Sequence, residues 1–125
     1  MSKFKSQGFF NTFKNARKGL RLVLKSEMNI RVHFVIAVIV LALALLLQFD
    51  AVKFCILLLT IGFVMVTEML NSAIEFGLDA VFRNKYSKLV GMAKDISAGA
   101  VMFATFLAII IGVILFGHEL IDFVN

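Results

Sequence analysis

The chain has 125 residues, of which 61% are hydrophobic and only 17% charged, with no Pro and no Trp. Its mean hydropathy of +0.96 and its long Leu, Ile and Val runs exclude an ordinary soluble domain, alone or beside a membrane part. The net charge is +5, and eight of the 13 basic residues lie within the first 31 positions. We therefore expect an all-α integral membrane protein that forms one membrane domain over residues 1–125.

The first predicted element is an amphipathic helix at about residues 7–26. Apolar side chains recur there at helical spacing, and basic side chains occupy the adjoining arc. We expect this helix to lie in the plane of an anionic cytoplasmic membrane surface and to contact membrane lipids rather than nucleic acid. Taken alone, the helix could equally be an anchor without a catalytic part.

Three apolar runs are long enough to cross a hydrocarbon core of about 30 Å. The first covers residues 32–49. The second begins near Ala51, is apolar through Val66 and is expected to continue as helix to Phe82, so that its last turns leave the membrane. The third covers residues 92–117 and is expected to end at Gly117, since Gly commonly follows the last residue of a helix.

The basic residues predict the orientation of these spans. The segment before the first span and the loop before the third are rich in Lys and Arg, the short 48–53 turn carries only Lys53, and the tail after Phe116 carries none. We expect a bacterial cytoplasmic (inner) membrane protein with its N-terminus in the cytoplasm and its C-terminus outside. An odd number of spans agrees with this arrangement.

A cluster of polar side chains lies in the last turns of the second span. At 100° per residue, five of them fall on one narrow face: Glu68, Asn71, Ser72, Glu75 and Asp79. Ionisable groups inside a span cost about 2.5–3.5 kcal/mol each on insertion scales, so they normally face a protein interior, a cavity or a bound ion. The functional interpretation is a reaction site, and the plainer alternative is a polar seam that packs helices together.

The predicted topology brings further polar residues to the same leaflet. The expected set is Glu27, Glu68, Asn71, Glu75, Asp79, Lys94 and Asp95. A proton-coupled transporter would more naturally hold its acid near the middle of the membrane. Residues at head-group depth instead suggest two substrates, one a lipid and one a soluble cytosolic molecule.

Small residues recur every fourth position on the third span, at Ala100, Ala104, Ala108 and Gly112. Such a ridge allows close approach of helix backbones in lipid. Three helices can hardly enclose a site of seven polar groups, so we expect an oligomer. Ser97 and Gly99 either keep the region beside the polar cluster open or serve ordinary helix packing.

Other chemistries have little support in the sequence. The single Cys55 lies in an apolar run and is interpreted as a core or lipid-facing residue. His33 and His118 have no partners at metal-ligand spacing, so we interpret His33 as a cytoplasmic-interface residue and His118 as an external one. Phosphate-binding loops of the G-x-x-x-x-G-K-[ST] type, Gly-rich kinase loops and room for a βαβ nucleotide fold are all missing.

Three sequence features together resemble a known family. They are E-M-L-N-S-A-I-E-x-x-x-D at residues 68–79, A-K-D at residues 93–95, and Glu27 upstream. This pattern is similar to that of the prokaryotic diacylglycerol kinases, small three-span membrane kinases, over about residues 15–117. The segments E-M-N-I-R-V-H at 27–33 and A-K-D-I-S-A-G-A-V at 93–101 look more like the Gram-positive branch, whose members are undecaprenol kinases.

The resemblance implies a homotrimer with sites between neighbouring protomers, each taking ATP with Mg²⁺ from the cytosol and a lipid alcohol from the bilayer. Glu68 resembles the family's general base, which binds the lipid hydroxyl. Glu27 and Glu75 resemble the carboxylates that hold the metal bridging the ATP phosphates. Mg²⁺ prefers hard oxygen ligands and usually takes one or two carboxylates, which agrees with those two roles.

The resemblance also implies a set of nucleotide contacts. Asn71 resembles the amide near the γ-phosphate, and Lys94 and Asp95 resemble nucleotide-contacting residues, with Lys94 toward the phosphates. Asp79 lies where the family has an acid near the nucleotide. The surface-helix arginine of the family has no convincing counterpart before about Asn15, so contacts from that helix are open.

We therefore predict an ATP-dependent lipid kinase that acts on undecaprenol, with diacylglycerol as the alternative acceptor. The grooves that tell these two lipids apart are formed by apolar side chains whose arrangement a sequence does not give. A small proton-coupled transporter is a more distant alternative and would work without ATP hydrolysis. A purely structural membrane protein would tolerate Glu68→Gln and Glu75→Gln, and a pore would need no acidic face.

Overall fold

The structure is a computed structural model that describes residues 8–125 and contains four helices in that range. Helix α1 covers Phe9–Ser26. The surface helix predicted from residue 7 thus begins two residues later, and Gln7 itself lies outside the described part of the chain. Its apolar side chains are largely exposed in the single chain, and Val23 is the buried residue of the helix.

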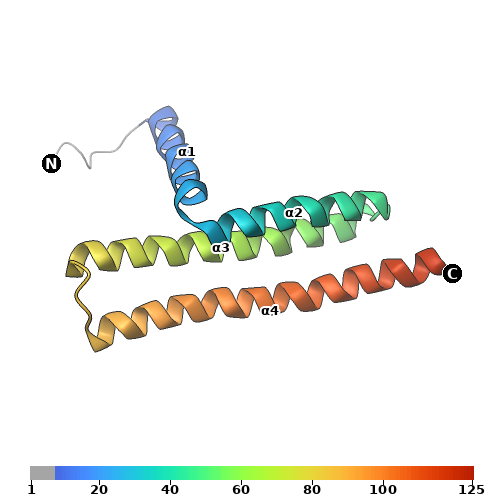
Figure 1. The fold of residues 1–125 in the computed structure, drawn as a ribbon. Coiled ribbons are helices and arrows are strands. Elements are labelled where there is room, and N and C mark those ends of the chain that lie inside the picture. Colours follow the sequence, from blue (N-terminus) through green and yellow to red (C-terminus); the bar gives the residue numbers. More distant parts are fainter. Residues whose placement is uncertain (1–7) are drawn as a thin grey trace.

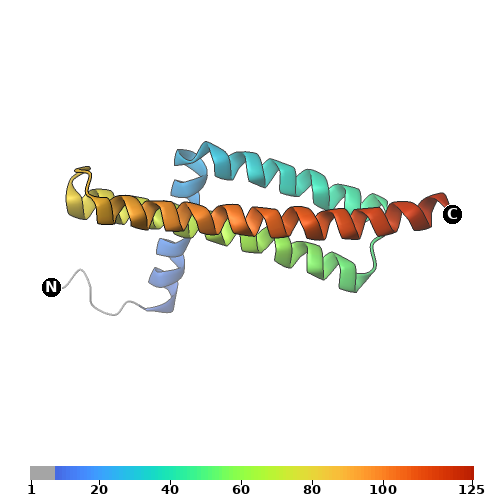
Figure 2. The same ribbon diagram turned by 90° about the horizontal axis from the view of Figure 1, so that it is seen from below.

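Three longer helices form an antiparallel bundle: α2 (Met28–Leu46), α3 (Ala51–Phe82) and α4 (Lys88–Val124). Each is long and apolar enough to cross a membrane, which confirms the prediction of an all-helical chain with three candidate spans. Figures 1 and 2 show α4 alongside α3 for most of its length. Helix α2 lies alongside only one half of α3, the half at the end of the bundle where the C-terminus of the chain lies. Helix α1 crosses the bundle axis steeply at the start of α2.

The connections between helices have local causes. Glu27 is the one residue between α1 and α2, with an extended backbone (φ −112°, ψ 111°). The Arg31 guanidinium donates to the carbonyls of Leu24 and Lys25, at 3.2 and 2.6 Å, and so satisfies the open C-terminal end of α1. Together these contacts fix the sharp turn that separates α1 from the bundle.

Side-chain caps start the other two helices. The carboxylate of Asp50 accepts a hydrogen bond of 2.8 Å from the backbone N–H of Lys53 at the start of α3. The hydroxyl of Ser87 accepts one of 3.2 Å from the N–H of Val90 at the start of α4. These are ordinary N-caps, each of which stabilises a helix by about 1 kcal/mol.

The centre of the bundle is apolar. Ala44, Leu57 and Leu115 form a buried cluster with one residue from each of α2, α3 and α4. Ala104, which belongs to the small-residue ridge, is almost completely buried, whereas Ala100 at the start of the ridge is exposed. Within one chain, the ridge therefore contributes to packing through its middle and not along its whole length.

The prediction that the third span ends at Gly117 is wrong. Helix α4 runs on to Val124, and no described Gly has a positive φ, so Gly117 does not adopt the left-handed conformation of a helix-ending glycine. The helix continues because the turn after Gly117 makes polar contacts of its own. Helix α4 also begins at Lys88, four residues before the predicted start, because Ser87 caps it.

Those contacts form an outer cluster of Lys53, His118, Glu119 and Asp122. Lys53 Nζ lies 2.6 Å from Glu119 Oε1 and 2.9 Å from His118 Nδ1. His118 Nδ1 lies 3.5 Å from Asp122 Oδ2. The outer cluster joins the first turn of α3 to the last turns of α4, at the end of the bundle where the C-terminus lies (Figure 1).

Candidate functional site

The polar face predicted on α3 lies at the other end of the bundle. Val64, Glu68 and Ser72 are buried at intervals of four residues, so one stripe of the helix faces the interior and changes from apolar to polar along its length. On α2, Ile30 and Ala37 are buried seven residues apart and pack toward the same interior. The apolar positions thus fix the rotation of both helices and direct the polar stripe inward.

Glu68 is the most deeply buried acid of the described chain. Its side chain is only 8% exposed, and its Oε1 atom lies 3.3 Å from Nδ1 of His33 on α2. The other oxygen, Oε2, is buried and has no hydrogen-bond partner among residues 8–125. A buried carboxylate oxygen without a partner is costly, so this atom is a candidate contact for a bound group.

Asn71 connects α3 to α4. Its Oδ1 accepts a hydrogen bond from the hydroxyl of Ser97, and its Nδ2 lies 3.5 Å from Oε1 of Glu75, at the outer limit for a hydrogen bond. The Ser97 hydroxyl also lies 3.4 Å from the carbonyl of Lys94. The amide of Asn71 is therefore held in one orientation, with its carbonyl toward α4 and its NH₂ group toward Glu75.

Lys94 and Asp79 form an ion pair farther along the same pair of helices. Lys94 Nζ lies 2.6 Å from Asp79 Oδ1, and the two side chains are 35% and 38% exposed. A pair this exposed contributes little to stability, about 0–1 kcal/mol. Its lysine is consequently available to exchange its partner for a more highly charged anion.

Glu27 and Asp95 are not joined to the other candidates. The half-buried side chain of Glu27 and the exposed side chain of Asp95 form no ion pair or hydrogen bond with residues 8–125. Glu27 lies at the break between α1 and α2, and Asp95 follows Lys94 on α4. The single chain thus brings Glu68, Asn71, Glu75, Asp79 and Lys94 into two contact groups and leaves two acids open.

A closed metal centre is not present within one chain. Among residues 8–125, no group of three or more His, Cys, Asp or Glu side chains is arranged to hold a metal ion. Glu27 and Glu75 nevertheless lie at similar depth. Glu27 precedes His33 by six residues and Glu75 follows Glu68 by seven. These separations correspond to about 9 and 10.5 Å along the two helices from the contact between His33 and Glu68. Both carboxylates retain free oxygen lone pairs, as a hard cation requires.

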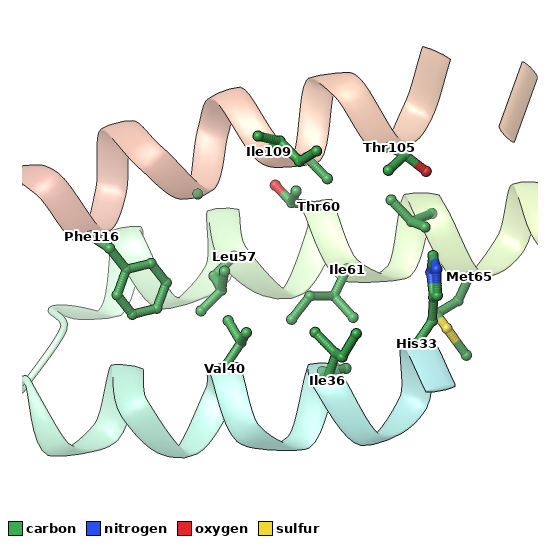
Figure 3. Close-up of a pocket in the computed structure, with 14 residues that line it drawn as sticks. His33, Ile36, Val40, Leu57, Thr60, Ile61, Met65, Thr105, Ile109 and Phe116 are labelled. Atoms are coloured by element: carbon green, nitrogen blue, oxygen red, sulfur yellow. The ribbon is translucent and has the colours of Figure 1, made fainter. Parts of the chain in front are cut away.

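An apolar cavity of about 390 Å³ lies between α2, α3 and α4. Figure 3 shows His33 and Met65 at one end of the cavity and Phe116 at the other, with Ile36 and Val40 along α2. The hydroxyls of its two threonines donate to carbonyls of their own helices. The cavity therefore offers an apolar lining along its length and a polar group, His33, at the end next to Glu68.

Two contact residues were missed or undervalued in the sequence. The sequence pattern assigns His33 only to the membrane interface, yet this residue pairs with Glu68. The pattern does not decide between packing and an open site for Ser97, whose hydroxyl donates to Asn71. One signal could have found His33, because antiparallel neighbours place the start of the first span beside the end of the second. The contact between His33 and Glu68 thus follows from their similar depth in two neighbouring helices, and not from residue spacing along one helix.

Comparisons with known proteins identify the family of this chain. The model of the family described as prokaryotic diacylglycerol kinase matches residues 14–116. The chain is 33% identical over 108 residues to undecaprenol kinase of Bacillus subtilis, an alignment that covers 86% of this chain and 87% of that protein.

Two further relatives carry the name diacylglycerol kinase. The Synechocystis protein is 36% identical over 101 residues, which cover 81% of this chain but only 58% of that protein. The Escherichia coli protein is 36% identical over 93 residues, which cover 74% of this chain and 75% of that protein. Because the family match spans most of the sequence and relatives above 30% identity align over more than two thirds of it, the chain belongs to the prokaryotic diacylglycerol kinase family of lipid kinases.

Proposed function

We propose that this protein transfers the γ-phosphate of ATP to the hydroxyl of a membrane lipid alcohol. The observation that carries the proposal is the buried Glu68 carboxylate, which has one free oxygen and lies next to the polar end of an apolar cavity. A lipid alcohol presents an apolar chain and one hydroxyl, which this combination of surfaces suits. Family membership supplies the reaction class.

Glu68 is proposed as the general base. The hydroxyl proton passes to Glu68 Oε2 while the hydroxyl oxygen forms the new bond to the γ-phosphorus. The bond from that phosphorus to the bridging oxygen breaks, and the electron pair leaves with ADP. A positioned base contributes about 10²–10⁴-fold to such a step, and the rest of the acceleration comes from positioning and charge neutralisation.

The nucleotide is proposed to bind beside Asn71, Asp79, Lys94 and Asp95. Lys94 would leave Asp79 for the phosphates, which carry more charge than one carboxylate. The NH₂ group of Asn71 would point to the γ-phosphate, since Ser97 holds the opposite side of the amide. The side chain of Asp95 is exposed and has no partner among the described residues.

Mg²⁺ is the proposed cofactor, with Glu27 and Glu75 as its protein ligands. Two carboxylates at similar depth with free lone pairs are a donor set that suits this ion. When bound, the ion would neutralise charge on the ATP phosphates. Without it, Glu75 contacts only the Asn71 amide, at 3.5 Å, within the described chain.

We propose undecaprenol as the acceptor, with diacylglycerol as the second candidate. The undecaprenol kinase of B. subtilis aligns with this chain over 87% of its own length, more than the two diacylglycerol kinases do. The slightly higher identity of those diacylglycerol kinases, 36% against 33%, favours the second candidate. Both acceptors place a primary hydroxyl at the head-group level, so the same base serves either.

We further propose a homotrimer in the bacterial inner membrane, with the N-terminus and the Phe82–Lys88 connection in the cytoplasm. A neighbouring protomer would supply partners for Glu27 and Asp95, which one chain leaves open. Helix α1, with its exposed Phe side chains and adjacent basic residues, would lie on the cytoplasmic membrane surface. Light scattering in detergent, with the detergent mass subtracted, tests the trimer.

The deciding experiment for the activity is a direct transfer assay. Purified protein in detergent is given Mg²⁺ and ATP with a radiolabelled γ-phosphate, together with undecaprenol or diacylglycerol in parallel, and Glu68→Gln serves as the control. Preferred labelling of undecaprenol, lost in the variant, is the expected result. Preference for diacylglycerol would select the second candidate. Labelling of neither lipid would refute the kinase and return the acidic face to a proton-coupled transporter.

A further inference from the structure

The contact between His33 and Glu68 joins two spanning helices at the buried acid. The Glu68 side chain is 8% exposed and that of His33 is 32% exposed, so the pair lies at the edge of the interior with the acid on the inner side. His33 is the one ionisable partner within 4 Å of Glu68 among the described residues. Whatever orients this carboxylate within the chain must therefore act largely through His33.

Packing holds the histidine in place. On α2, the buried Ile30 and Ala37 lie three residues before and four residues after His33, so all three share the face that packs toward α3. On α3, Val64 and Ser72 are buried four residues on either side of Glu68. Each member of the pair thus lies between two buried neighbours, which limits how far either side chain can turn.

The two oxygens of Glu68 are in different situations. Oε1 lies 3.3 Å from the Nδ1 nitrogen of His33, and Oε2 is buried without any hydrogen-bond partner among residues 8–125. A carboxylate is planar, so a donor on one oxygen fixes the direction of the other. Buried polar atoms without partners are rare and call for a specific explanation.

We infer that His33 is a positioning residue for the proposed base. In that role a proton on Nδ1, which lies 3.3 Å from Oε1 of Glu68, sets the plane of the carboxylate and leaves Oε2 as the acceptor for the lipid hydroxyl. The inference rests on the proposed function, because it assigns a use to Oε2 that only an acceptor hydroxyl supplies. His33 itself does not touch the reacting atoms.

The cavity gives the pair its place relative to the lipid. His33 lines the end of the apolar cavity, and its ring lies beside Met65 there (Figure 3). The hydroxyls of Thr60 and Thr105 are bonded to the carbonyls of Ile56 and Val101 and do not compete for the substrate hydroxyl. An apolar chain inside the cavity would bring its polar end to the side where His33 holds Glu68.

Two substitutions separate hydrogen bonding from packing. His33→Phe keeps a ring of similar size at the end of the cavity but removes the donor. His33→Asn removes the ring but places an amide NH₂ close to the position of Nδ1. Both variants and the wild type are purified in the same detergent, and kcat and KM for ATP are measured with the preferred lipid.

We expect His33→Phe to lower kcat about 10- to 100-fold while KM for ATP stays within about twofold, since the nucleotide is held elsewhere. His33→Asn should retain kcat within about threefold of the wild type. A His33→Phe enzyme with wild-type kcat would overturn the inference. Equal loss in both variants would also overturn it, because a restored donor would then not restore the activity. Loss in His33→Asn alone would show instead that the ring acts by filling the cavity.

A second readout does not depend on catalysis. The infrared difference spectrum between the wild type and Glu68→Gln isolates the bands of the Glu68 carboxyl group. We expect those bands to shift in the His33→Phe background and to stay near their wild-type position with His33→Asn. Unshifted bands in His33→Phe would refute the contact even if the wild type were fully active. If the wild type phosphorylates no lipid but the bands shift in His33→Phe, the contact is upheld and only the kinase proposal is refuted.

Discussion

The two ends of the helical bundle are both polar, but their charged side chains differ in how completely they are paired. At the outer end, Lys53 has Glu119 and His118 within 3 Å, and His118 in turn contacts Asp122. At the opposite end, Glu68 is more deeply buried than any of these residues and leaves one oxygen without a partner in the described chain. Similar residue types thus form a closed cluster at one end and an open one at the other.

The difference separates structural polarity from functional polarity. Charged side chains that are paired with each other hold helices together and need no bound ligand. Buried groups that lack partners reduce stability, and a fold retains them where another molecule completes the set. The comparison predicts that substitutions at the outer cluster change stability, whereas substitutions at the polar face of α3 change activity.

The largest effect is expected from two matched acid-to-amide substitutions. Glu68→Gln removes the proposed base and should lower lipid phosphorylation about 10²–10⁴-fold with little change in thermal unfolding. Glu119→Gln, whose side chain is 15% exposed, should leave the activity unchanged and lower the unfolding temperature. Transfer assays and thermal unfolding in one detergent check both. Activity of Glu68→Gln above a tenth of wild type would contradict the comparison.

Two lysines, each 2.6 Å from a carboxylate, provide the next test. Lys94→Met should raise KM for ATP about 10- to 100-fold, because a charge-assisted contact to phosphate is lost. Lys53→Met should leave that KM unchanged and lower the unfolding temperature by a few degrees. The measurement is a full ATP titration for each variant. An equal rise in KM for both lysines would show that the two ends are not separate in function.

A smaller effect is expected for the pair that fixes the amide. Ser97→Ala should lower kcat about two- to fivefold, since it removes a hydrogen bond that orients Asn71 without removing the amide itself. Asn71→Ala should have a larger effect, and the double variant should be no worse than Asn71→Ala alone. Rates at saturating ATP and lipid test this. Fully additive losses would mean that Ser97 acts independently of Asn71.

The smallest expected change concerns stability alone. Gly117→Ala should stabilise the protein by about 0.5–1 kcal/mol, because Gly117 lies within α4 and an added Cβ meets no atom within 4 Å. At the other end, Gly91→Ala should gain less, since its Cβ would approach the Tyr86 ring to 2.9 Å and displace it. The expected outcome for Gly117→Ala is a higher unfolding temperature with unchanged kinase activity. A loss of stability in Gly117→Ala would indicate a contact from a neighbouring protomer.

The sequence predicted the fold where local rules dominate. Hydropathy alone identifies three spans, because only long apolar runs satisfy a bilayer, and helical spacing places Glu68 and Ser72 on the one face that the structure buries. The end of α4 was mispredicted at Gly117 because the residues that extend the helix are stabilised by Lys53, which lies 65 positions away from His118. Contacts at such separation leave no trace in a local pattern.

The sequence predicts which residues form the site but not which of them contact one another. Glu68, Asn71, Glu75 and Asp79 follow from their spacing on one helix, and the structure adds which neighbour each of them meets: His33 for Glu68, Ser97 for Asn71 and Lys94 for Asp79. These pairings depend on the rotation of α2 and α4 about their own axes. Apolar packing of residues such as Ile30 and Ala104 sets that rotation.

The uninterrupted course of α3 from Glu68 to Asp79 restricts how this sequence can change in length. One inserted residue between these positions would turn Asp79 about 100° away from Lys94 and lengthen the segment by about 1.5 Å. Insertions and deletions should therefore be excluded from residues 68–79, whereas the connection between Phe82 and the capping Ser87 can vary in length. Homologous chains of different length should differ there, at the tip of the hairpin, and keep the interval of eleven residues constant.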